Sequence, residues 1–156
     1  MFSKRARYAL HGVGFLAHRH GEPPLPFSEI LRYLQGYSSE LSLSPGYISK
    51  IFQDLSRAGI VRSALGRKGG YTLGRDPDLL RVADVVVAVD KHPLEPCCLL
   101  SIDGCRREGA CGVNQLIREA QESLFRFLAG ETVAALARRM FGERPAPAEP
   151  AEPRKS

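Results

Sequence analysis

Apolar residues recur at helical spacing in the first part of the chain. Between about Ser3 and His18 they lie three or four positions apart, which predicts an amphipathic helix. This apolar stripe consists of Ala6, Ala9, Leu10, Val13, Leu16 and Ala17. The glycine and prolines of residues 21–26 end the helix. A shorter helix around residues 30–34 follows, and Ser28 is a candidate for its N-cap.

A third predicted helix has the clearest start signal in the chain. Ser44 can accept a hydrogen bond from a free N–H of the first turn, and Pro45 suits the first helical position. Gly59 fits the left-handed conformation that ends many helices. One face of this helix is apolar, with Ile48, Ile51, Phe52 and Leu55. The opposite face carries small or hydrogen-bonding residues, namely Gly46, Ser49, Lys50 and Gln53.

A β-hairpin is predicted next, because residues 60–65 and 71–73 are short strand-like runs around a glycine-rich tip at 66–70. The valine-rich run 82–89 suits a strand or a helix, and its apolar residues at helical spacing favour a helix. The apolar residues of 91–112 follow neither helical nor strand spacing, which predicts a loop.

The last third of the chain predicts a long amphipathic helix of about 16 residues ending at Gly130, then a short helix from Thr132 to Phe141. The apolar stripe of the long helix consists of Leu116, Ile117, Ala120, Leu124, Phe127 and Leu128. This stripe is long for a small core, so we expect it to pack against a second copy of the chain. Packing onto the first helix of the same chain is the alternative. Residues 143–156 contain four prolines and predict a disordered tail.

Composition and charge narrow the class of protein. The chain has 156 residues, about one domain, with 44% apolar and 25% charged residues. No stretch approaches the roughly 18 apolar residues of a membrane span, and the start lacks the apolar run of a secretory signal, so we expect a cytoplasmic protein without membrane contact. Residues 1–75 hold 11 Lys and Arg against 4 Asp and Glu, a net charge of +7, whereas the remainder has −2. A polyanionic partner is therefore expected at the N-terminal half.

The order of the predicted elements is that of a winged helix-turn-helix, a mainly α fold with a small β-hairpin wing. In such a fold the third helix enters the major groove of DNA and the wing contacts phosphates or the minor groove. The candidates for base contact are Ser44, Gly46, Tyr47, Ser49 and Lys50. The wing candidates are Arg62, Arg67 and Lys68, and the candidate phosphate clamps are Lys4, Arg5 and Arg7. A tight hairpin with solvated charges is the alternative interpretation.

All four cysteines lie in the predicted loop, at Cys97, Cys98, Cys105 and Cys111. Their gaps are longer than the pairs of most structural zinc sites and differ from ferredoxin spacings. An iron–sulfur cluster, a zinc site, a disulfide switch and inert thiols all stay open on spacing alone.

Several motifs together resemble the IscR/NsrR family of bacterial winged-helix regulators over about residues 1–140. The motifs are Ser3-Lys4-x-x-Arg7-Tyr8-Ala9-Leu10, Ser44-x-x-Tyr47-Ile48-x-Lys50-Ile51, Ala58-Gly59-Ile60-Val61, Gly66-x-x-Gly69-Gly70-Tyr71-x-Leu73, Asp84-Val85-Val86-x-Ala88-Val89 and the three-cysteine loop before a long helix. The resemblance implies a homodimer held by the long helix and an iron–sulfur cluster, 2Fe–2S or 4Fe–4S, whose state controls operator affinity.

The resemblance also implies which residues hold the cluster. The family's three cysteine ligands match Cys98, Cys105 and Cys111, with Cys97 as a possible substitute for Cys98. Some members use a histidine three residues after the last cysteine, where this chain has Asn114. Others take a ligand from the first helix of the partner subunit, and His11 matches that histidine position. Family members have an arginine where this wing has Leu65, so Arg67 or Lys68 is expected to take its role.

These patterns predict a redox-, nitric oxide- or iron–sulfur-responsive regulator, with repression expected, that binds a palindromic double-stranded operator as a homodimer. A thiol- or zinc-based regulator and a protein-binding adaptor without DNA readout are the alternatives. No enzyme motif and no small-molecule substrate site is evident. The expected organisation is a DNA-binding domain over 1–75, a connecting helix and cysteine loop over 76–112, a dimerisation helix and C-terminal helix over 113–142, and a tail over 143–156.

Overall fold

The computed structural model of the chain describes residues 2–37, 44–66, 69–91 and 112–143. Within them the elements are α1 (Lys4–His18), α2 (Phe27–Gly36), α3 (Pro45–Arg57), β1 (Val61–Ala64), β2 (Gly70–Leu73), α4 (Val82–Asp90), α5 (Gly112–Gly130) and α6 (Val133–Phe141). The predicted winged-helix fold class, the helix at the valine-rich run and the hairpin are confirmed. The predicted cysteine loop and tail lie outside the described residues.

The helix starts differ from the predictions in two details. Pro26, not Ser28, is the N-cap of α2, and Ser28 lies in the first turn. Ser44 is the N-cap of α3 and Pro45 occupies the first position, but the Ser44 hydroxyl makes no capping hydrogen bond. The N–H of Tyr47 instead donates to the backbone carbonyl of Ser44 at 3.0 Å, so the amide that the hydroxyl would have capped is already satisfied. Gly59 ends α3 with a φ of +68°, as predicted.

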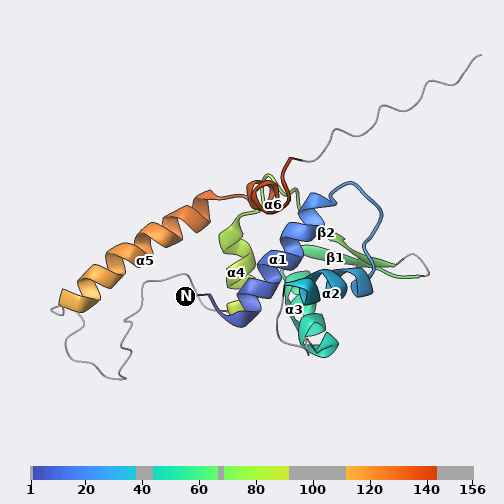
Figure 1. The fold of residues 1–156 in the computed structure, drawn as a ribbon, viewed down its shortest axis with the longest axis horizontal. Coiled ribbons are helices and arrows are strands. Elements are labelled where there is room, and N and C mark those ends of the chain that lie inside the picture. The colour runs from blue at the N-terminus through green and yellow to red at the C-terminus, as the bar shows by residue number, and fades with distance from the viewer. Residues whose placement is uncertain (1, 38–43, 67–68, 92–111, 144–156) are drawn as a thin grey trace, which may run out of the picture.

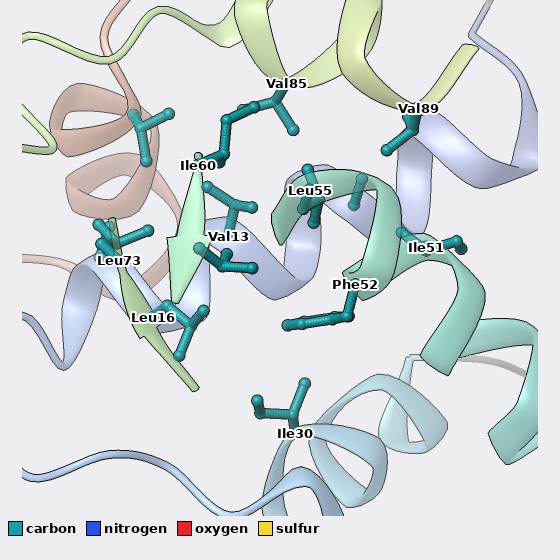
Figure 2. Packing of buried hydrophobic residues seen from close by; sticks show 14 of the residues in the cluster. Val13, Leu16, Ile30, Ile51, Phe52, Leu55, Ile60, Leu73, Val85 and Val89 are labelled. Carbon is teal, nitrogen blue, oxygen red and sulfur yellow. The ribbon is translucent and has the colours of Figure 1, made fainter. Parts of the chain in front are cut away.

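The core forms around α1, which packs against α2, α3, α4, α6 and β2. The largest fully buried side chain is Phe52 of α3. Figure 2 shows its ring directed toward Val13 and Leu16 of α1 and Ile30 of α2. Burying an aromatic side chain of this size is among the larger single contributions to stability in a small domain. The apolar face of α3 is therefore fixed in the core, and its other face is turned outward.

The wing is an antiparallel hairpin in which Val61 pairs with Leu73 and Ala64 with Gly70. Leu25, in the connection before α2, forms an isolated antiparallel bridge with Tyr71 of β2, in which the two residues exchange N–H···O bonds of 3.0 and 2.8 Å. A Cβ at Gly70 would lie 2.2 Å from the Leu25 carbonyl oxygen, so this close approach requires glycine. The base of the wing is thus joined to the helical core.

Helix α5 extends from one side of the molecule, and the hairpin lies on the opposite side (Figure 1). Among the described residues α5 packs on α4 rather than on α1, and Leu128 near its C-terminal end is buried. The junction that follows is held by the side chain of Arg81, the N-cap of α4, and by the backbone of Val82. The guanidinium of Arg81 donates to the Gly130 carbonyl at 2.8 Å, and the Val82 N–H donates to the Glu131 carbonyl at 3.0 Å.

Candidate nucleic-acid interface

The outward face of α3 carries the residues predicted to contact bases. Ser44, Gly46 and Lys50 are exposed, and Ser49 is half-buried. They occupy the N-terminal half of the helix, while Ile48, Ile51, Phe52 and Leu55 are buried on the other side. The apolar spacing of the sequence therefore dictates which polar side chains face outward. Hydroxyl and ammonium groups on such a face can hydrogen-bond to base edges in a major groove.

Tyr47, another predicted base contact, is half-buried and packs on α1. Its ring meets that of Tyr8 edge-on, with 6.2 Å between centroids and an interplanar angle of 84°. This contact ties the start of α3 to the first helix. Tyr47 therefore contributes to the packing of α3 in addition to any contact with DNA.

The wing presents Arg62 and Leu65 on its surface. Arg62 lies exposed on β1 opposite Thr72, and Leu65 before the tip is 98% exposed. Arg67 and Lys68, the two basic residues predicted for the tip, lie outside the described residues. An aromatic contact joins the wing to α3, because the Tyr71 and Phe52 ring centroids are 4.9 Å apart. The wing and the outward face of α3 are thus held by one packed cluster.

The basic residues at the start of α1 do not share one environment. Lys4 and Arg7 are exposed, as a phosphate clamp requires. Arg5 is half-buried: its guanidinium forms an ion pair with Asp54, and its Nε donates to the Val89 carbonyl at 3.2 Å. The structure thus argues against Arg5 as a phosphate clamp, because its charge is engaged inside the chain.

Asp54, which the sequence interpretation missed, is a buried charged residue with an exposed fraction of 8%. Besides Arg5, its carboxylate lies 2.8 Å from Arg57 Nη1 and 3.5 Å from Lys91 Nζ. Burial raises the pKa of Asp54, but Lys91, Arg5 and Arg57 outweigh burial and hold the pKa below its ordinary value. The spacing of Asp54 and Arg57, one helical turn apart, was the available sequence signal.

His11, the predicted fourth cluster ligand, lies in an aromatic cluster between α1 and α2. Its Nδ1 is 3.5 Å from the Tyr33 hydroxyl, and its ring centroid is 5.1 Å from that of Tyr37. Burial lowers the pKa of His11, which favours the neutral imidazole that a metal ion requires. Burial and the neighbouring Tyr37 raise the pKa of Tyr33 well above its ordinary value. The donor chemistry of His11 therefore fits a metal ligand, although its ring has partners within its own chain.

The four cysteines lie outside the described residues. Within residues 2–37, 44–66, 69–91 and 112–143, no three His, Cys, Asp or Glu side chains gather as a metal site. In the same ranges, no helix has both the length and the apolar character needed to cross a membrane.

Known proteins resemble this chain along most of its length. Residues 2–139 match the Rrf2 family, described as an iron-dependent transcriptional regulator. The HTH-type transcriptional regulator IscR of Sodalis glossinidius (strain morsitans) is 31% identical over 134 residues, which cover 86% of this chain and 76% of that protein. The solved structure of CymR (YrzC), the global cysteine regulator of B. subtilis, has a TM-score of 0.69 at 27% identity and covers 89% of this chain and 97% of its own.

A structure of T. potens IscR has a TM-score of 0.66 at 22% identity and covers 90% of this chain and 88% of its own, which supports the fold. The regulatory role in the names of these relatives agrees with the outward face of α3 and the hairpin, which indicate nucleic-acid binding in this chain. Because the family match spans nearly the whole chain, the protein belongs to the Rrf2 family and is a transcriptional regulator rather than an enzyme.

Proposed function

We propose that the protein binds a palindromic DNA operator as a homodimer and that an iron–sulfur cluster on its cysteine segment controls this binding. The outward face of α3, with Ser44, Ser49 and Lys50 above a buried apolar face, carries the DNA-binding part of the proposal. The net charge of +7 on residues 1–75 supports contact with phosphates.

The wing supplies the test of DNA binding. The double variant Arg67→Ala, Lys68→Ala removes two basic side chains from the hairpin tip, and we expect weaker operator binding in a gel shift. The slope of binding against salt concentration should fall by about two, one for each lost phosphate contact. Unchanged affinity and slope would favour a protein-binding adaptor over a DNA reader.

The homodimer is proposed from α5. Leu116, Leu124 and Phe127 on this helix are 71%, 42% and 53% exposed. They share one face of the helix and continue the predicted apolar stripe, and a second copy of the chain is the simplest partner to bury them.

The cluster is proposed on Cys98, Cys105 and Cys111, with Cys97 as a substitute for Cys98 and His11 of the partner subunit as the fourth ligand. The iron dependence in the description of the family supports iron at this segment. When bound, a 2Fe–2S or 4Fe–4S group supplies redox-active iron that also reacts with nitric oxide. The neutral imidazole favoured at His11 suits a ligand role, which His11→Ala tests through the visible spectrum and lifetime of the cluster.

A regulator based on thiols or zinc is the second candidate. The similarity to CymR, a global cysteine regulator, favours it. Anaerobic purification with a visible spectrum and counts of iron, sulfide and zinc separates the two. We expect a coloured protein with iron and sulfide, and a colourless protein with stoichiometric zinc would overturn the cluster.

A further inference from the structure

Asp54 lies where three helices meet, and its charge is neutralised from each of them. Arg5 comes from the first turn of α1, Arg57 from α3 itself, and Lys91 directly follows α4. The Arg57 pair is local to α3, because the two residues are one helical turn apart. The other two pairs cross between helices, so they fix the position of α3 relative to its neighbours.

The start of α1 and the end of α4 are also bound directly to each other. Besides its ion pair, Arg5 donates to the Val89 carbonyl in the last turn of α4, and the Ser3 hydroxyl donates to the Asp90 carboxylate. Because the Asp54 carboxylate is buried, the positions of its cationic partners determine how well its charge is compensated. Movement at the end of α4 displaces Lys91 and the Val89 carbonyl that Arg5 binds, and so changes the surroundings of Asp54.

Lys91 has an unusual backbone for its residue type. Its φ is +59°, the left-handed conformation that usually belongs to glycine or asparagine at the end of a helix. No other non-glycine residue in the described ranges has a positive φ. In this conformation the ammonium reaches the Asp54 carboxylate at 3.5 Å, and the chain continues directly into the cysteine-bearing residues 92–111.

We propose that Asp54 is a positioning residue of α3, and that Lys91 couples the position of α3 to the state of the cysteine segment. Arg5 and Asp54 hold α3 against α1, while the Lys91 contact adds the end of α4 to the same network. A rearrangement that begins at residue 92 then reaches Asp54 of α3 most directly through Lys91, the residue that precedes this segment. This inference takes from the proposed function only the regulatory role of the cysteine segment.

The test compares Lys91→Asn with Arg57→Gln. Each variant removes one cationic partner of Asp54, but only the first removes the contact from the end of α4. Asparagine tolerates the left-handed conformation, so the helix end is preserved. Asp54→Asn alone is a poor test, because it weakens all three pairs at once and cannot separate the contact from the end of α4 from the contacts of Arg5 and Arg57.

The readout is hydrogen–deuterium exchange of the α3 peptides in the full-length protein without DNA. Exchange is measured in the reduced protein, after alkylation of the cysteines with iodoacetamide, and after anaerobic reconstitution with ferrous iron and sulfide. In the wild-type protein we expect alkylation to change α3 exchange by about fivefold or more. Lys91→Asn should abolish most of this change, whereas Arg57→Gln should retain it.

Three results would overturn the proposal: wild-type α3 unaffected by alkylation, an undiminished response in Lys91→Asn, or equal losses in both variants. Operator binding is measured separately on the same samples. If α3 responds as expected but no cluster forms or no DNA is bound, the proposed function fails and the coupling through Lys91 stands.

Discussion

The ring of Phe52 on α3 meets the ring of Tyr71 on β2 at an angle of 64°, with 4.9 Å between centroids. Tyr71 is in turn bonded through its backbone to Leu25, before α2. The two surfaces proposed to touch DNA, the outward face of α3 and the wing, are therefore supported by one aromatic contact on their inner side. Removing this contact should lower both the free energy of unfolding and the affinity for DNA.

Phe52→Ala is expected to lower the free energy of unfolding by about 3–5 kcal/mol, because it leaves a large cavity under both α3 and the wing. Urea denaturation followed by circular dichroism measures this loss. The matched control is the adjacent, exposed Gln53→Ala, which should change stability by no more than about 0.5 kcal/mol. Equal effects in the two variants would contradict the packing described for α3.

Lys50→Ala should weaken operator binding by about 1–3 kcal/mol and relax the sequence preference at one base position, as expected for a side chain that contacts a base edge. Because Lys50 is exposed, the melting temperature should not change. Arg7→Ala is the comparison, since a lost phosphate contact weakens binding to all sequences alike and lowers the salt slope by about one. If Lys50→Ala weakened binding to all DNA sequences equally, Lys50 would be a phosphate contact and not a base contact.

Asp54 should make the free energy of unfolding depend on pH in the acid range. Its pKa in the folded chain lies below the ordinary value of 3.8, so the carboxylate stabilises the fold above about that pH. This contribution is lost as the pH falls through the folded-state pKa, when protonation weakens the pairs with Arg5, Arg57 and Lys91.

Asp54→Asn is therefore expected to cost about 1–3 kcal/mol at pH 7, and the gap to the wild-type protein should narrow below about pH 3.8. Denaturation curves between pH 7 and 3 measure the gap. Asp78→Asn, at a largely exposed carboxylate, should cost no more than about 0.5 kcal/mol. A gap that widens in acid would contradict a lowered pKa of Asp54 in the folded chain.

The double variant Leu116→Gln, Leu124→Gln is expected to turn the proposed dimer into a monomer, because it makes the exposed apolar face of α5 polar. Sedimentation equilibrium measures the mass, and circular dichroism should show an unchanged fold, since both side chains are exposed within one chain. Arg118→Gln, Glu122→Gln alters the opposite side of α5 and should leave the dimer intact. An unaltered mass in the first variant would exclude this face as the interface.

Local signals in the sequence predicted most of the fold. The apolar stripes of α1 and α3, the proline at the start of α3 and the glycines of the hairpin each act within a few residues, so their structural outcome can be read from neighbouring positions. The same spacing also identified Lys50 as an outward residue of α3.

Contacts between distant residues could not be predicted in this way. Arg5 looks like one more basic residue at a helix start, and only the fold brings it to Asp54, 49 positions later. His11 likewise meets Tyr33 from the next helix, 22 positions away. The environment of a charged or titratable side chain depends on such pairings, which is why a sequence pattern assigned Arg5 to phosphate and overlooked Asp54.

The junction after α5 has a geometric consequence for the proposed dimer. Helix α5 has 19 residues, and the bonds from Arg81 and Val82 hold its C-terminal end at the start of α4. At 1.5 Å per residue such a helix is about 28 Å long, so a rotation of about 10° at the junction displaces its far end by about 5 Å. The hydrogen bonds at Gly130 and Glu131 thus lie at the pivot of α5, and in the proposed dimer small angular changes there would alter the distance between the outward faces of the two α3 helices.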